Sequence, residues 1–429
     1  MTTRLKLITV AAAMMTAALT AEAQKAKEPV QRLTIGGYGE ATMSYNFYSN
    51  SVFRYSLADR YTESKGYGQA DIPHFVVMLG YDFGHGWTLG SEIEFEHGGT
   101  EVAVEVEDEE TGEFEKEVER GGEVALEQFW IQKTFCKQFN IMAGHIIVPI
   151  GLTNSHHLPT EFFTVFRNEG ENTILPCTWH QTGISLWGRA GDWRYEAQLL
   201  PGLNSAYFNV SEWIHSGSAS PYEFTPMSKL AGVLRVDNYS VKNLRIGISG
   251  YVGDSFNNDI VTEEKSTKYA GVNGTLAIGS ADFEYKGRNF IARGNFDYGY
   301  LADASSIGTR NKNSNNQTES PYFHTLVGET AMAGGAEAGY DMLSFFDRKK
   351  DSKKLYLFGR YEYYDSYTPS NNQMDYTWTD RQRWAVGLNY YPMKEIVIKA
   401  EYSRRMFHAG YNPEPSVSIG IAYSAYFKK

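Results

Sequence analysis

Five arginines stand in stretches of the chain where polar and apolar residues alternate. Arg235 lies between Leu234 and Val236, and the same spacing recurs at the others: Arg194, Arg245, Arg293 and Arg360. Successive side chains of a β-strand point to opposite faces, so the alternation predicts that all five guanidinium groups share one polar face. A guanidinium binds a phosphate or a carboxylate through a planar, two-pronged contact. The arginines therefore predict either anion binding or ion pairs along that face.

Carboxylates fall on the same polar face by the same alternation: Glu92, Glu94, Glu196, Asp297, Glu362 and Glu401. If this face surrounds an aqueous passage, rings of arginine favour anions. Alternatively, each arginine pairs with one of these carboxylates and braces the wall. Both interpretations make the five arginines, with Glu92 and Glu94, candidate pore-lining residues, and the alternation alone does not choose between them.

The segment 75–96, FVVMLGYDFGHGWTLGSEIEFE, shows the kind of element that must carry these side chains. Its alternation predicts a hairpin with one aromatic and aliphatic face and one face rich in glutamate. A soluble sandwich also alternates, with its polar face in water. A membrane barrel instead turns its apolar face to lipid and its polar face to a wet interior. The hairpin by itself fits both.

Similar segments recur and predict sixteen strands, each about as long as the roughly ten residues that a tilted strand needs to cross a bilayer. The predicted ranges are 33–46, 73–83, 87–97, 124–135, 139–148, 181–189, 193–201, 229–236, 244–253, 272–285, 289–300, 329–342, 354–363, 382–390, 396–404 and 416–427. Short and long connections alternate between them, which is typical of outer-membrane barrels and not of Greek-key sandwiches. We predict an all-β fold, a transmembrane antiparallel 16-stranded β-barrel.

The first residues predict export through a signal peptide. Two basic residues precede an apolar run at 7–19, and Ala21-Glu22-Ala23 fits the small-x-small cleavage rule. We therefore expect a signal peptide at 1–23 and a single barrel domain at 24–429. No later segment has the eighteen consecutive apolar residues that would predict a transmembrane helix.

Composition supports the barrel over other classes. Aromatic residues make up 14% of the chain, which suits the aromatic girdles at bilayer interfaces, although an aromatic-rich secreted sandwich is the alternative.

The net charge of −11 comes mainly from residues 101–120, which we predict to form an acidic hairpin continuing the third and fourth strands. A solvated loop is the alternative there. No basic stripe is present, so nucleic-acid binding is not expected.

The third long connection, residues 151–181, is the predicted constriction. A barrel of sixteen strands is too wide for its own side chains to fill, so something must narrow it. This connection is rich in aromatic residues and has few charges, and we expect it to fold inward against the wall. An outer loop packed on its neighbours is the alternative. The candidate constriction residues are Glu161, Phe162, Phe163, Phe166 and Arg167.

Metal and covalent chemistry are not predicted. His156 and His157 are adjacent, and adjacent residues of an extended strand point in opposite directions, so one cation rarely takes both. No motif places a serine and a histidine together as a nucleophile and its base, so we expect no enzyme activity and no cofactor. Cys136 and Cys177 are expected to be unbridged because one falls in a short turn and the other in a long loop.

Two motifs flank the predicted constriction: Ala143-Gly144-His145 leading through Val148-Pro149-Ile150-Gly151, and the return from His180-Gln181-Thr182 to Trp187-Gly188. In their order and with this strand count, the chain resembles the phosphate-selective porin family of Gram-negative outer membranes. The resemblance implies a homotrimer, a ladder of lumen arginines and basic residues on the third loop that select anions. Here Arg167 is the single basic residue of that loop, and the polar face also carries many carboxylates.

These observations predict an outer-membrane porin that passes small hydrophilic solutes or ions by passive diffusion, with a preference for anions such as phosphate as one option. The expected partners are outer-membrane lipid and lipopolysaccharide, the permeating solutes or anions and, from the resemblance, two further copies of the chain. A surface-exposed, plugged barrel acting as an adhesin or assembly protein is the alternative. A secreted soluble sandwich is the third interpretation.

Overall fold

The computed structural model describes residues 32–108, 114–220, 222–258, 260, 269, 271–313, 325–346, 353–370, 373–408 and 410–428. The predicted signal peptide and acid-rich residues 109–113 lie outside these ranges, so the cleavage site remains a prediction. Within the described ranges, no helix is long and apolar enough to cross a membrane.

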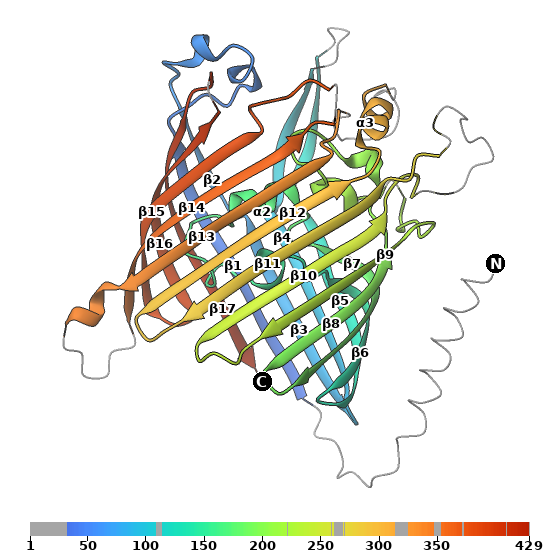
Figure 1. The fold of residues 1–429 in the computed structure, drawn as a ribbon. Coiled ribbons are helices and arrows are strands. Elements are labelled where there is room, and N and C mark those ends of the chain that lie inside the picture. The colour runs from blue at the N-terminus through green and yellow to red at the C-terminus, as the bar shows by residue number, and fades with distance from the viewer. Residues whose placement is uncertain are drawn as a thin grey trace.

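The chain forms one antiparallel sheet that closes on itself (Figure 1). Its strands are β1 (Arg32–Asn46), β2 (Tyr67–Asp71), β3 (His74–Gly84), β4 (Trp87–Asp108), β5 (Phe114–Cys136), β6 (Phe139–Ile147), β7 (His180–Ala190), β8 (Trp193–Pro201), β9 (Leu230–Asn238), β10 (Leu244–Asp254), β11 (Thr275–Lys286), β12 (Phe290–Leu301), β13 (Thr330–Asp341), β14 (Lys354–Thr368), β15 (Asp380–Met393), β16 (Ile396–Phe407) and β17 (Glu414–Lys428). Each strand from β3 onward pairs with the next, and β1 closes the ring by pairing with both β3 and β17. The 16-stranded barrel is therefore confirmed.

The seventeenth strand does not widen the barrel. β2 pairs with residues 42–46 of β1, while β3 pairs with residues 32–39 of the same strand. The two strands thus lie end to end along β1, interrupted by Ile72-Pro73. A proline has no N–H to donate to a ladder, so it breaks a strand at this point. The alternation predicted residues 47–72 as one long connection, but residues 67–71 form β2 as a separate strand because Pro73 divides the segment.

Several connections contain short helices that the alternation could not predict. They are η1 (Val52–Arg54), η2 (Ala58–Tyr61), η3 (Thr153–Ser155), α2 (Glu169–Ile174), η4 (Ser205–Tyr207), η5 (His215–Ser218), α3 (Ala304–Asn313) and η7 (Met342–Phe345). In contrast, β3 ends at Gly84 and the turn to β4 is His85-Gly86, within the predicted break at residues 84–86. Gly84, His85 and Gly86 all have positive φ, which explains the two glycines.

The acidic hairpin is confirmed. β4 and β5 continue to pair beyond the rest of the sheet, from Glu101 opposite Gly121 to Asp108 opposite Phe114. Figure 1 shows this ribbon, in cyan, rising above the barrel rim.

The outer surface of the barrel is apolar, as the alternation predicts. Along β9, Leu234 is 65% exposed while its neighbour Arg235 is 2% exposed. The last strand repeats the pattern, with Ile419 at 51% and Ser418 at 3%. An outward apolar face on every side is unfavourable in water but suits hydrocarbon, and the closed sheet leaves no edge unpaired there.

We predict that Leu234→Arg, near the middle of β9, lowers the free energy of unfolding by about 2–4 kcal/mol, because a charge on the lipid face must enter the bilayer centre. Urea titration of the protein folded into lipid vesicles measures this loss. Ser240→Arg, in the connection after β9, is the matched control and should change stability by at most about 1 kcal/mol. Equal losses in the two variants would contradict a lipid-facing Leu234.

Candidate functional site

The connection between β6 and β7 is mostly buried rather than solvated. Its first part follows directly from the apolar end of β6, and Val148, Ile150 and Trp179 have no exposed surface. They belong to one apolar cluster with inward side chains of several strands, where the Trp179 ring lies 5.2 Å from that of Tyr251. This packing brings the connection against the inner wall.

Carboxylates of the wall accept hydrogen bonds from the backbone of this connection. The N–H of Phe163 donates to Glu337 of β13 at 3.2 Å, and the N–H of Val165 donates to Glu401 of β16 at 2.7 Å. Gly170, in α2, donates to Glu362 of β14 at 2.8 Å. The three glutamates alternate with exposed residues along their strands, so they are inward side chains.

Donors of the wall satisfy the carbonyls of the same stretch. Lys399 of β16 donates to the carbonyl oxygens of Phe162 and Thr164 at 3.0 and 2.8 Å. Asn389 of β15 donates to the carbonyl of Phe163 at 2.9 Å. Backbone polar groups that have no neighbouring strand are paired here by side chains instead. We call residues 162–170 and the wall side chains that bond them the docking seam.

The candidate constriction residues occupy different surroundings. Phe163 is buried and stacks on Phe358, with ring centres 5.5 Å apart. Phe162 lies beneath the Lys399 ammonium, 3.9 Å from its ring centre, whereas Phe166 is 37% exposed. Glu161 faces His156 at 3.8 Å; burial raises the pKa of Glu161, but the interaction with His156 outweighs burial and lowers that pKa overall.

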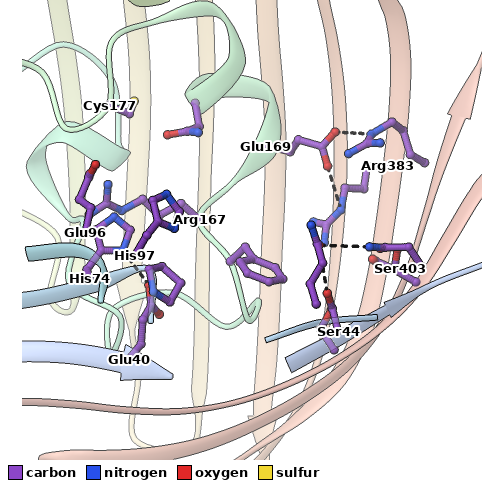
Figure 2. A pocket seen from close by; sticks show the side chains of 18 of the residues that line it. Glu40, Ser44, His74, Glu96, His97, Arg167, Glu169, Cys177, Arg383 and Ser403 are labelled. Carbon is purple, nitrogen blue, oxygen red and sulfur yellow. Dashed lines mark hydrogen bonds and ion pairs between the residues drawn. The ribbon is translucent and has the colours of Figure 1, made fainter. Parts of the chain in front are cut away.

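Ion pairs form a continuous chain along the inner wall, passing through the connection at Glu169. In order, its members are Glu284, Arg293, Glu337, Arg360, Glu362, Arg383, Glu169, Arg405, Glu414 and Arg54. Figure 2 shows Glu169 facing Arg383. Burial raises the pKa of Glu169, yet the charges of Arg405 and Arg383 dominate and lower that pKa to about 2.

A second ionic group lies where the connection leaves β6. Arg235 donates to Asp237 and Asp282 and to the carbonyls of Pro149 and Gly151. Arg245 shares both aspartates, but its Nε and Nη2 atoms have no hydrogen-bond partner. Nearby, Arg194 bonds Glu196 and Asp237.

All five predicted arginines therefore pair with carboxylates, and their role in selecting ions remains a prediction. The sequence analysis did not select Arg383, Arg405 or Lys399, although the same alternation places them inward; Lys399 lies between Ile398 and Ala400. Asp282 and Glu337 were missed in the same way. Cys136 and Cys177 are unbridged, as expected.

A cavity of about 760 Å³ contacts Asn172 and Thr173 of the connection. Two further cavities border residues 154–169 through different residues. One of about 550 Å³ is lined by Phe166, Arg167 and Glu169, and also by Glu40 and His74 of the opposite wall (Figure 2). The other, of about 320 Å³, is lined by residues 154–157 and by the group around Arg235 and Arg245. Because residues of 154–169 border both cavities, the connection lies between two hollow regions rather than beside one.

Glu92 and Glu94 lie on the wall opposite the docking seam, near Arg167. Burial alone would lower the pKa of Arg167, but Tyr38, Glu94 and Glu127 raise it above its ordinary value. Glu94 is 5% exposed, and neither carboxylate is paired with an arginine by direct contact within the described ranges. This wall is therefore the acidic side of the interior.

Comparisons with known proteins agree with the fold. No family model matches the chain. An uncharacterized protein of Aquifex aeolicus (strain VF5) is 25% identical over 387 residues, which cover 89% of this chain and 78% of that protein. The outer membrane channel DcaP of Acinetobacter baumannii aligns with a TM-score of 0.53 at 11% identity, over 94% of this chain and 99% of DcaP.

A loop-deletion mutant of OmpT, an outer membrane protein of Vibrio cholerae, aligns with a TM-score of 0.50 at 11% identity, over 92% of this chain and 100% of that one. At these identities the likeness shows the fold, which is that of outer-membrane porins and channels. The specific resemblance to phosphate-selective porins remains a prediction.

We predict that Lys399→Met detaches the docking seam, because two buried carbonyls lose their donor at about 1–3 kcal/mol each. The free energy of unfolding should fall by roughly 2–6 kcal/mol, and limited proteolysis of the folded protein should cut within 158–170. Lys394→Met is the matched control, since Lys394 is an exposed residue of the β15–β16 turn. Equal protease resistance of the two variants would contradict the docking role of Lys399.

Proposed function

We infer that this protein is an outer-membrane channel through which small hydrophilic solutes or ions diffuse passively. The observation that carries this inference is the pair of cavities, lined by charged side chains, on either side of the connection between β6 and β7. A sixteen-stranded barrel leaves space that its own side chains cannot fill. The apolar outer face is then the surface that meets membrane lipid and lipopolysaccharide.

The connection between β6 and β7 is the proposed constriction. The docking seam holds it against β13–β16, so the remaining passage runs between Arg167 and the acidic wall opposite. Phe166, which is partly exposed in the larger cavity, narrows that passage further. No step of this function requires a cofactor or a covalent intermediate. A homotrimer is proposed from the family resemblance.

Selectivity is proposed to arise in the 320 Å³ cavity. Its lining carries four arginines, Arg189, Arg194, Arg235 and Arg245, against two carboxylates, Glu196 and Asp237. Arg245 lines this cavity, so its positive charge acts on an anion that passes there. In the larger cavity three arginines face three carboxylates, so that region gives no such bias. The channel is therefore proposed to prefer anions weakly.

The plugged barrel is the second candidate, and one observation favours it. The two cavities have no lining residue in common, and the packed connection lies between them. A plugged barrel would serve as an adhesin or assembly protein.

A planar bilayer separates the two candidates. The purified mature chain should produce stepwise ion currents in a symmetric salt solution, while detergent without protein produces none. Full insertion without current would support the plugged barrel and contradict diffusion through the interior.

We predict that Arg245→Ala raises the permeability of cations relative to anions by roughly two- to fivefold, since a unit charge at about 4 Å in water contributes about 1 kcal/mol. The reversal potential under a salt gradient measures this ratio. Arg288→Ala is the matched control, because Arg288 is an exposed residue between β11 and β12 and carries the same charge. An unchanged ratio in Arg245→Ala would assign Arg245 to bracing alone.

A further inference from the structure

A β-bulge turns one glutamate of β5 toward the interior. Glu92 of β4 lies opposite Gln128 and Ile93 lies opposite Leu126, so Glu127 is an extra residue without a partner. Such a bulge re-aims a side chain, and bulges are frequent beside functional sites. Glu127 has no exposed surface and faces the barrel interior beside Glu92. The bulge interrupts the register of the β4–β5 hairpin and places the Glu127 carboxylate beside that of Glu92.

His157 of the β6–β7 connection completes this group. One ligand atom each from Glu92, Glu127 and His157 lie within 4.8 Å of one another. Glu92 Oε2, Glu127 Oε1 and both ring nitrogens of His157 are inaccessible to water and have no hydrogen-bond partner. The other oxygen of Glu127 accepts from the Tyr38 hydroxyl at 3.3 Å. Three ligand atoms, one from each residue, therefore converge without a partner in a buried place.

Such an arrangement is costly unless a cation neutralises it. Two carboxylates held together repel each other, and each buried unpaired polar atom costs about 1–3 kcal/mol. The charge of Arg167 acts on Glu127, but among the described residues no ion pair joins Arg167 to Glu92 or Glu127. The same charge also acts on Glu40 and Glu94. The two unpaired oxygens and the imidazole remain available to an ion.

We propose that Glu92, Glu127 and His157 bind a divalent transition-metal ion of the Zn²⁺ class. Two carboxylates balance its charge, and one imidazole nitrogen directs the choice away from Mg²⁺ and Ca²⁺, which prefer oxygen ligands alone. The bound ion joins the connection to β4 and β5, on the wall opposite the docking seam. Residues 157–170 are then held on both sides of the interior.

A neighbouring group, His74, Glu94 and Glu96, has similar residue types but different bonding. His74 already bonds Glu40 at 3.1 Å, and its other ring nitrogen lies 3.9 Å from Glu94. His156 lies 3.8 Å from Glu161 rather than at the proposed site, so the proposal uses His157 alone and departs from the sequence-based expectation of no metal site at these two histidines. His74 and His156 therefore supply controls of the same residue type.

The experiment measures Zn²⁺ binding to the full-length mature barrel in detergent after treatment with a chelator. Equilibrium dialysis should give one tightly bound ion per chain, and Co²⁺ in its place should give a visible absorption band from protein ligands. His157→Gln and Glu127→Gln should weaken binding by at least about tenfold, since loss of even an outer-shell partner costs roughly 10- to 100-fold. His156→Gln and His74→Gln should bind as the wild type does.

The proposal is wrong if the wild type binds Zn²⁺ no more tightly than His157→Gln, which would leave the two carboxylates sharing a proton. It is equally wrong if His74→Gln, rather than His157→Gln, removes the Co²⁺ band. Circular dichroism establishes that each variant is folded, and Glu92→Gln replaces any variant that is not. Because the readout is metal binding in detergent, this result does not depend on whether the barrel conducts ions.

Discussion

The interior of this barrel depends on one requirement: a polypeptide segment placed away from bulk water must find a partner for every polar backbone group. Strands of the sheet find theirs in neighbouring strands. The connection between β6 and β7 has no such neighbours, so Glu337, Glu401 and Lys399 take their place. The charges of the inner wall are thus part of the architecture, and they set the path of the connection before any solute arrives.

Pairing also changes what the arginines can do. From Arg293 to Arg405, each guanidinium of the chain contacts at least two carboxylates, so the opposite charges largely cancel and the side chains are fixed in position. Arg245 differs because it lines the 320 Å³ cavity, where its charge can act on an ion, although its two unpaired N–H groups are buried. For the five predicted arginines, bracing of the wall and selection of anions were alternatives. The two roles are therefore better assigned to each arginine separately.

Alternation in the sequence was sufficient to predict the barrel, its sixteen strands and the inward orientation of Arg235 and Arg245. Successive side chains of a strand point to opposite faces, so each face recurs with a period of two residues. The same rule fails at Glu127, where the bulge shifts the period, and at Pro73, where a strand is divided. It says nothing about partners: Lys399 and the carbonyl of Phe162 are far apart in the chain, and only the closed fold brings them together.

The pairing of β1 with β17 joins residues from opposite ends of the chain, Ile35 with Lys428. This edge of β1 therefore cannot be filled until the last strand has been made. Until then the hydrogen-bonding edge of β1 stays open to wrong partners, including other copies of itself. Closure of the ring depends on contacts between residues far apart in the chain, which are the contacts that form slowly during folding.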